Sequence, residues 1–151
     1  MRVAFGCDHR GVLLRDAVLQ ELAALGHEVV DLGTNDPTVR VDYPDTAADV
    51  ADAISSGRAD RAVLVCGSGA GVAIAACKHR GIRASVCHDV YSAHQAVEHD
   101  DMNVLCLGSE IVGAALAAEL VRSFAGASFD GEDGHRRRLE TLARLEAARV
   151  A

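Results

Sequence analysis

The sequence is poor in aromatic residues, in proline and in long hydrophobic runs. Of its 151 residues, 3% are aromatic, none is tryptophan and only two are proline, although half of the chain is hydrophobic. The core must therefore be built mainly from alanine, valine and leucine. No apolar run reaches the roughly 18 residues that a membrane-spanning helix needs. The amino terminus runs straight into a strand pattern and does not resemble a signal peptide. These absences predict a soluble, cytoplasmic protein without a membrane partner.

Positive charge is scarce as well, and so are paired cysteines. The formal net charge of −7 at pH 7 argues against non-specific binding of nucleic acid. The cysteines are odd in number, and no two of them have CxxC spacing; they are Cys7, Cys66, Cys77, Cys87 and Cys106. This pattern favours reduced thiols over a disulfide framework or a zinc site.

Short apolar segments alternate with segments of helical periodicity along the chain. The expected strands are 2–7, 27–33, 61–66, 82–87 and 103–108. The expected helices are 11–25, 44–56, 70–79, 90–98, 110–125 and 135–150. Continuously apolar strands separated by helices are typical of a parallel sheet covered on both faces. With right-handed crossovers, the prediction is one α/β domain over 1–151. It is a Rossmann-like, doubly wound, five-stranded parallel sheet in three αβα layers, followed by a C-terminal helix.

Polar residues follow most of the expected strands. Ligands of such sheets bind beyond the carboxyl ends of the strands. At that edge the sequence places Cys7-Asp8-His9, Cys66 with a glycine loop, Cys87-His88-Asp89 and Gly108-Ser109-Glu110. The turn at His99 enters the last strand from its opposite end. His99 therefore joins the same site only if a neighbouring subunit supplies it.

The segment CGSGAGV, which begins at Cys66, combines a thiol with a glycine loop at a helix start. Backbone N–H groups in such a loop form an anion site, and the helix dipole favours the thiolate. A thiolate beside an anion cradle suits proton abstraction next to a carbonyl, while the loop holds the resulting enediolate. The local sequence equally allows Cys66 to be the last core residue of its strand, with the loop as a plain turn.

Other motifs fit this loop less well. A dinucleotide fingerprint requires a third glycine where Val72 stands, and the lysine of a Walker motif is missing. A phosphatase loop built on cysteine would need arginine in place of Val72. An acyl-transfer nucleophile at Cys66 remains an alternative.

Eight segments carry a resemblance to a known family. They are AFGCDHRG (4–11), DLGT (31–34), DYP (42–44), CGSGAGVAIAACK (66–78), GIRA (81–84), YSA (91–93), HDDMNVLCLGSEIVG (99–113) and HRRRLE (135–140). In this order, over nearly the whole length, the chain resembles the ribose-5-phosphate isomerase B family, which includes galactose-6-phosphate isomerase subunits. The resemblance implies an aldose–ketose isomerase that converts a sugar phosphate through a cis-enediol, in the first instance ribose 5-phosphate to ribulose 5-phosphate. It also implies no metal, no organic cofactor, and a homodimer or tetramer with active sites at subunit interfaces.

The resemblance further implies roles for individual residues. Cys66 matches the base that abstracts the proton, and His99 matches the acid that opens the sugar ring. Ser68, which keeps the hydroxyl of the commoner threonine, and Asp8 complete the catalytic set. The substrate-binding set is His9, Tyr43, Gly67, Gly69, Ala70, Gly71, Asp100, Asn103 and Arg138.

The chain departs from the family pattern where the substrate phosphate would bind. Glu110 and Gly134 replace two arginines that serve the phosphate, and Asp100 and Cys77 replace asparagines. Arg138 keeps its place, and the candidates to compensate are Arg40, Arg83, Arg136 and Arg137. These departures leave a tetrose phosphate, a hexose phosphate or an unphosphorylated sugar as alternative substrates. They also leave a non-catalytic sugar-phosphate-binding module of the same fold as an alternative function.

Overall fold

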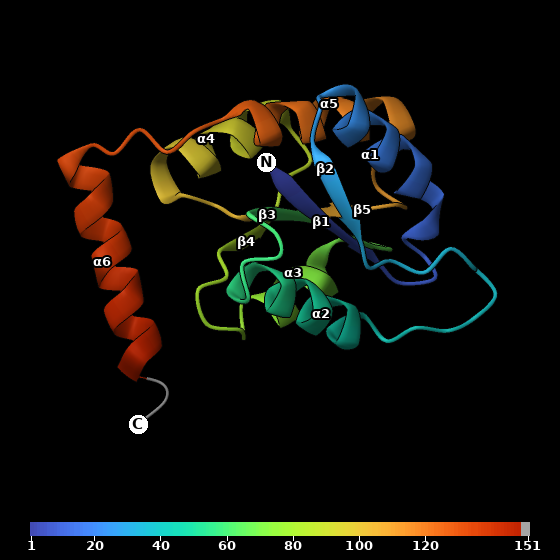
Figure 1. The fold of residues 1–151 in the computed structure, drawn as a ribbon, viewed down its shortest axis with the longest axis horizontal. Coiled ribbons are helices and arrows are strands. Elements are labelled where there is room, and N and C mark those ends of the chain that lie inside the picture. The colour runs from blue at the N-terminus through green and yellow to red at the C-terminus, as the bar shows by residue number, and fades with distance from the viewer. Residues whose placement is uncertain (149–151) are drawn as a thin grey trace.

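Strands and helices alternate up to residue 126, and one further helix follows (Figure 1). A computed structural model describes residues 1–148. The strands are β1 (Arg2–Cys7), β2 (Glu28–Asp31), β3 (Arg61–Cys66), β4 (Ala84–Val86) and β5 (Val104–Gly108). The helices are α1 (Val12–Ala24), α2 (Tyr43–Ser55), α3 (Ala70–Ala76), α4 (Val90–Asp100), α5 (Ala114–Gly126) and α6 (Asp133–Ala148). Within the part of the chain that is described, no helix has the length and apolar character that crossing a membrane requires.

The five strands form one sheet in the order β2-β1-β3-β5-β4, and every neighbouring pair is parallel. This confirms the predicted fold class. The chain runs outward from β1 to β2 and then returns past β1 to β3. The direction of winding therefore reverses between β1 and β3, and such a switch point is where open α/β sheets bind their ligands.

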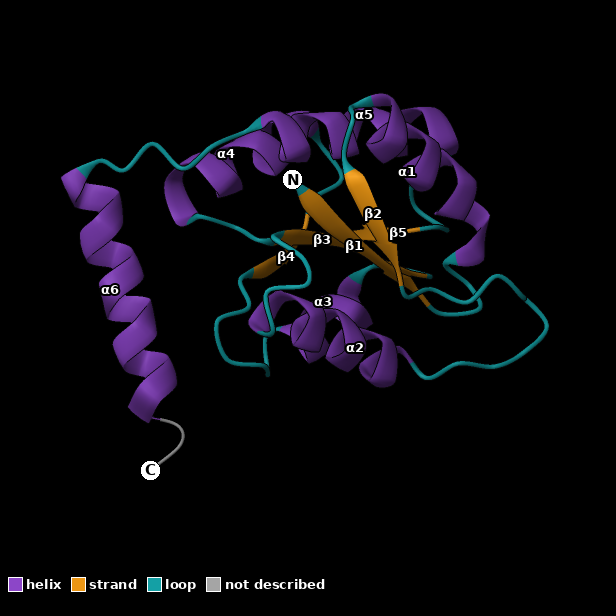
Figure 2. Cartoon of the chain, viewed as in Figure 1, coloured by secondary structure: helices purple, strands orange, loops and turns teal. Residues whose placement is uncertain are grey.

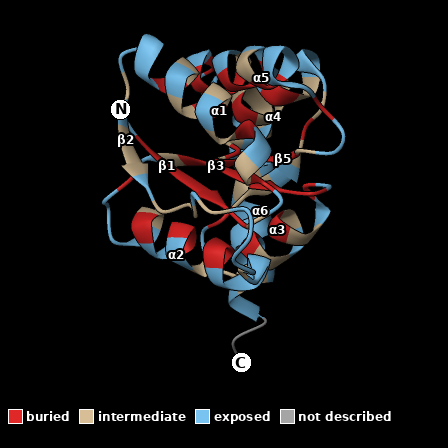
Figure 3. Cartoon of the chain, turned by 90° about the vertical axis from the view of Figure 1, so that its right-hand side faces the viewer, coloured by how far each residue is buried: buried red, intermediate tan, exposed pale blue. Residues whose placement is uncertain are grey.

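Helices cover both faces of the sheet and create two separate cores. Helices α1, α4 and α5 lie on one face, and α2 and α3 lie on the other (Figure 2). Successive strand side chains point to opposite faces, so Phe5 and Val65 join the first core while Ala4 and Leu64 join the second. Figure 3 shows the buried residues concentrated on the strands and on the inward sides of these helices. The sheet thus holds the ends of β1 and β3 rigidly side by side.

Two predicted helices were wrong in their extent. The segment predicted as helix 110–125 begins only at Ala114. Before it, the backbone N–H groups of Ser109 and Glu110 donate to the carbonyl oxygens of Cys66 (2.9 Å) and Gly67 (3.0 Å). These bonds tie the segment after β5 to the glycine loop and keep it out of the helix. The predicted helix 70–79 already ends at Ala76.

Helix α6 lies apart from the three layers and contacts the rest of the chain mainly through α4 (Figure 1). None of its described residues is buried. Leu142 and Leu145 are 48% and 62% exposed, although the helix has an apolar stripe. The last two residues of the predicted helix 135–150 lie outside the described residues. Within one chain, α6 therefore leaves its apolar side largely uncovered.

Candidate active site

The glycine loop joins the carboxyl end of β3 to α3 and holds the sulfur of Cys66. The side chain of Cys66 is almost buried, with 5% exposed. The backbone N–H of Gly69 donates to Cys66 Sγ at 3.2 Å. Gly69 has a φ of +80°, a left-handed conformation that glycine adopts without steric cost. The loop thus directs a backbone hydrogen-bond donor at the sulfur of Cys66.

Gly69 is the residue on which the shape of this loop depends most. A Cβ at this position would lie 3.0 Å from the carbonyl carbon of Leu107 and would have a left-handed backbone. We expect Gly69→Ala to lower turnover at least tenfold, because a shift of about 1 Å at a site can cost on the order of 10²-fold in rate. Gly57→Ala is the matched control, since Gly57 also has positive φ (+72°) but nothing lies within 4 Å of its Cβ position. That variant should lose only about 1–2 kcal/mol of stability and keep full turnover; equal kinetic effects of both changes would contradict the prediction.

The turn after β1 places Asp8 next to Cys66. The backbone N–H of Asp8 donates to the carbonyl oxygen of Val65 at 3.2 Å. The Asp8 side chain is buried, and its Oδ1 accepts the backbone N–H groups of Arg10 and Gly11, each at 2.9 Å. One carboxylate oxygen therefore holds the turn in shape. The other oxygen has no partner among the described residues, so it can face a ligand.

His9, Tyr43 and Ser68 surround the same edge of the sheet. The ring nitrogen Nδ1 of His9 lies 3.3 Å from the backbone N–H of Val41, which belongs to the long loop before α2. The ring of Tyr43 packs over the first turn of α3, 3.2 Å from where a Cβ of Gly71 would be. The exposed Ser68 Oγ accepts the N–H of Ala70 at 3.3 Å. The structure thus brings these three predicted residues together around the glycine loop.

Arg10 also lies over this loop, and the sequence reasoning missed it. Its guanidinium carbon is 2.7 Å from where a Cβ of Gly67 would be. Arg10 Nε donates to Glu110 Oε1 at 3.0 Å, and Nη2 contacts the same oxygen. This hydrogen bond raises the pKa of Arg10 and lowers the pKa of Glu110. The carboxylate of Glu110 is therefore paired with Arg10. The replacement of an arginine by Glu110 alone had suggested an unpaired negative charge at this position. The signal was available, because Arg10 directly follows Asp8 and His9.

His99, Asp100, Asn103 and Arg138 lie away from Cys66 in the same chain. Helix α4 ends at Asp100 and leads into the start of β5, whereas Cys66 is aligned with Gly108 at the other end of that strand. The five residues of β5 alone separate the two ends by about 13 Å. One chain therefore does not assemble the complete predicted site.

Asn103 is occupied by backbone contacts at the start of β4 and β5. Its Oδ1 accepts the N–H of Arg83 at 2.8 Å, and its Nδ2 donates to the carbonyl oxygen of Gly81 at 2.9 Å. Both polar atoms of the side chain thus hold the loop before β4. This arrangement favours a structural role for Asn103 over direct contact with a substrate.

The arginines that were candidates to replace the missing phosphate-binding cations lie in different parts of the chain. Arg83 Nε donates to the carbonyl oxygen of Asp101 at 2.7 Å, and its Nη2 pairs with the Asp101 carboxylate at 2.6 Å. Arg136 Nε donates to the carbonyl oxygen of Gly131. Arg40 and Arg137 are exposed, as is Arg138. Arg83 and Arg136 are therefore engaged by oxygen atoms of their own surroundings, whereas Arg10 lies against the glycine loop that holds Cys66.

Three of the other cysteines are buried in surroundings that disfavour the thiolate, and the fourth lies on the surface. Burial raises the pKa of Cys7 to about 11 and also raises the pKa values of Cys87 and Cys106. Cys77 is exposed. Next to Cys87, the ring of His88 accepts the N–H of Gly108 on Nε2 at 3.0 Å, and burial lowers the pKa of His88. His88 therefore acts as a neutral support for the end of β5.

These differences predict an order of modification by iodoacetamide near neutral pH. Cys77 reacts because it is exposed, whereas the raised pKa values of Cys87 and Cys106 keep these two buried thiols unreactive. Cys66 reacts before them because its sulfur lies at the mouth of the glycine loop and accepts the N–H of Gly69. In the Cys77→Ser protein, peptide mass spectrometry should find the first label on Cys66. Modification of Cys87 or Cys106 at the same rate would contradict this interpretation.

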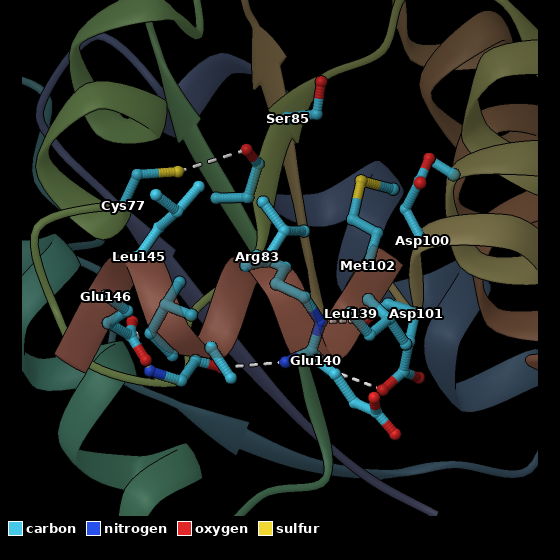
Figure 4. Close-up of a pocket in the computed structure, with 16 residues that line it drawn as sticks. Cys77, Arg83, Ser85, Asp100, Asp101, Met102, Leu139, Glu140, Leu145 and Glu146 are labelled. Carbon is cyan, nitrogen blue, oxygen red and sulfur yellow. Dashed lines mark hydrogen bonds and ion pairs between the residues drawn. The ribbon is translucent and has the colours of Figure 1, made fainter. Parts of the chain in front are cut away.

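A large groove of the described part of the chain lies at the end of α4 that carries Asp100, away from Cys66. Figure 4 shows this groove of about 1080 Å³ between α6 and the edge of the sheet at β4. Its lining includes Asp100 of the predicted substrate set, together with Arg83, Met102, Leu139 and Leu145. At its far end, the N–H of Gly81 donates to Glu146 Oε1 at 2.9 Å. The groove thus depends on how α6 stands off the body of the chain.

Comparison with known proteins matches this arrangement to sugar isomerases. Residues 3–142 match the family described as Ribose/Galactose Isomerase. Ribose-5-phosphate isomerase B of Escherichia coli (strain K12) is 43% identical over 148 residues, which cover 98% of each chain. D-erythrulose-4-phosphate isomerase 2 of Mycolicibacterium smegmatis is 36% identical over 150 residues, 98% of this chain and 99% of that one. The solved structure of Clostridium thermocellum ribose-5-phosphate isomerase B has a TM-score of 0.93 at 40% identity and covers 98% of this chain and 99% of its own.

Proposed function

Because the chain belongs to the ribose/galactose isomerase family, we propose that it interconverts ribose 5-phosphate and ribulose 5-phosphate through a cis-enediol. It is a sugar-phosphate isomerase. The observation that carries the proposal is the Cys66 sulfur, which accepts the Gly69 N–H at 3.2 Å beside the buried Asp8. A thiolate at the mouth of an anion-binding loop is suited to removing a proton next to a carbonyl.

The proposed reaction moves one proton between two carbons of the open-chain sugar. The Cys66 thiolate takes the proton from C2, and the electrons of that bond form the C1–C2 double bond of the enediolate. Backbone N–H groups of the loop 67–71 hold the negative oxygen, because a helix start leaves N–H groups without intrahelical acceptors; those of Gly69 and Ala70 also donate to Cys66 Sγ and Ser68 Oγ. The oxygen on C2 loses its proton and the oxygen on C1 gains one, with Ser68 and Asp8 beside them. The proton on the Cys66 thiol exchanges with solvent while the enediol is bound, and the thiol then protonates C1.

The proposal includes an active site shared between two copies of the chain. A second copy in a homodimer or tetramer supplies His99 as the acid that opens the sugar ring, together with Asp100 and Arg138 for substrate binding. Two features support this: the length of β5 separates His99 from Cys66 within one chain, and α6 leaves its leucines exposed. The enzyme works in the cytoplasm as a single domain, and its chemistry needs no metal or organic cofactor.

A different sugar phosphate is the nearest alternative as substrate. One relative of similar length is named for D-erythrulose 4-phosphate, and Glu110 and Gly134 change the charge where the phosphate would bind. The deciding experiment is a turnover screen of phosphorylated and free aldoses of four to six carbons in deuterium oxide. We expect turnover of ribose 5-phosphate with deuterium incorporated at the carbon that is reprotonated. Binding of sugar phosphates without exchange at any carbon would instead identify a non-catalytic binding module.

The pair of Arg10 and Glu110 provides a test of phosphate binding. If Arg10 supplies the cation that position 110 no longer carries, Arg10→Leu should raise KM for ribose 5-phosphate roughly 10- to 100-fold, the value of a charge-assisted hydrogen bond. Glu110→Gln should lower KM, because it frees the guanidinium. The matched control is Arg2→Leu, since Arg2 forms a comparably exposed ion pair with Asp60 at the other end of β1. An unchanged KM in the Arg10 variant would show that this guanidinium does not bind the substrate.

A further inference from the structure

Three potential metal ligands meet where α4, the α5–α6 loop and α6 come together. His99 lies in the last turn of α4, Asp130 lies in the α5–α6 loop, and His135 lies in the first turn of α6. One ligand atom from each residue lies within 4.8 Å of the other two. The two imidazole rings are stacked, with centroids 4.2 Å apart and planes inclined by 21°. The cluster thus joins the proposed ring-opening acid to two residues to which the isomerase chemistry assigns no role.

Backbone contacts hold Asp130 in place as a charged ligand. Its N–H donates to the carbonyl oxygen of Glu98 at 3.0 Å, which ties the loop to α4. Its Oδ1 accepts the N–H of Glu132 at 3.0 Å, and both carboxylate oxygens lie 2.9 Å from His135 Nδ1. The bonds from Glu132 and His135 lower the pKa of Asp130. The carboxylate is therefore already directed at His135.

Two imidazoles and one carboxylate form the protein ligand set of an open zinc site, in which water takes the fourth position. Zinc bonds of 2.0–2.2 Å in a tetrahedron require ligand atoms about 3.4 Å apart. The present ligand atoms lie within 4.8 Å of one another, and the Asp130 oxygens lie 2.9 Å from His135 Nδ1, so the spacing is near the value that zinc requires. We propose that His99, Asp130 and His135 form a site for Zn²⁺, and that a bound ion inhibits the enzyme.

The inhibitory effect rests on the proposed function of His99. An imidazole nitrogen whose lone pair is donated to zinc cannot carry the proton that opens the sugar ring. Metal binding requires His99 without a proton on the coordinating nitrogen, whereas an acid must carry a proton that it can donate. Zinc therefore acts as a reversible inhibitor of a reaction that itself needs no metal, and a chelator restores turnover.

The test measures metal binding and turnover separately, in untagged protein carrying Cys77→Ser to remove the exposed thiol. Calorimetry with Zn²⁺ should give one site per chain, and Co²⁺ should give the absorption bands of a tetrahedral site. His135→Ala and Asp130→Asn should each weaken binding tenfold or more, since even loss of an outer-shell partner of a metal costs 10–100-fold. His94→Ala, which removes an exposed histidine elsewhere on α4, should bind zinc as the parent does. Thermal melts without metal check that each variant is folded.

Inhibition of turnover by zinc, compared between variants, distinguishes this site from zinc bound at Cys66. The parent should lose activity with Zn²⁺ and regain it with EDTA, and the fractional inhibition at the same Zn²⁺ concentration should fall in His135→Ala and in Asp130→Asn. Equal inhibition of the parent and both variants would place the metal on the thiolate and overturn the proposal. The proposal would be overturned as well if the active enzyme gave no calorimetric signal with Zn²⁺ and no tetrahedral absorption bands with Co²⁺. Metal binding that depends on His135, in a protein that isomerises no sugar, would support the site and reject the proposed function instead.

Discussion

Cys66→Ser is expected to lose about 10²- to 10⁴-fold in kcat, the range that a general base contributes, while the fold stays intact. The physical reason is that a serine hydroxyl in the same position remains protonated near neutral pH. The Gly69 N–H that stabilises a thiolate at 3.2 Å cannot compensate for so large a difference in acidity. KM should change little, since the sulfur takes part in proton transfer and the surrounding loop binds the substrate. The measurement is steady-state turnover of ribose 5-phosphate, with a thermal melt of each protein.

The matched control is Cys77→Ser, which makes the same atomic change at an exposed cysteine. That variant should keep its kcat. An unchanged KM together with slow exchange of the C2 proton in the Cys66 variant would show that the substrate still binds and that only the base has been lost. A serine variant with near-normal turnover would remove Cys66 from the mechanism and return it to the role of a core residue at the end of β3.

Mixing two inactive variants, Cys66→Ala and His99→Ala, is expected to restore activity. If each site takes Cys66 from one copy and His99 from another, a mixed dimer contains one intact site and one site that lacks both groups. Random exchange between equal amounts gives mixed dimers for half of the molecules, so about a quarter of wild-type activity should return in a two-fold symmetric assembly. Each variant alone should stay near its background rate.

Subunit exchange must be verified independently, for example by native mass spectrometry of chains that differ in isotope content. A mixture of Cys66→Ala with Cys66→Ser is the control, because exchange between these chains creates no intact site. Complete exchange without recovered activity would contradict the shared site. So would a monomeric protein that retains full turnover.

The sequence predicted those parts of the site that depend on position relative to a strand. Asp8 and Cys66 each stand at or just beyond the end of a buried apolar segment, and parallel strands bring such ends to the same edge. The glycine pattern after Cys66 likewise predicted a tight loop at a helix start, and Gly69 has the positive φ that such a loop needs. The sequence could not predict that Glu110 pairs with Arg10. One hundred positions separate these residues, and their contact depends on β1 and β5 both flanking β3.

The amino-acid sequence by itself determined the layered α/β fold and the residues at the carboxyl ends of the strands, because alternation, periodicity and glycine spacing are local properties. Only the tertiary structure decided which distant side chains meet. The backbone bonds from Ser109 and Glu110 to the glycine loop delay the start of α5, and the path of the chain after α5 brings His135 and Asp130 to His99. The separation of His99 from Cys66 was predictable from strand order alone, because a parallel strand has two ends and the chain enters β5 at the one opposite to Cys66. The meeting of His99 with Asp130 and His135, by contrast, depends on packing between elements that no local pattern shows.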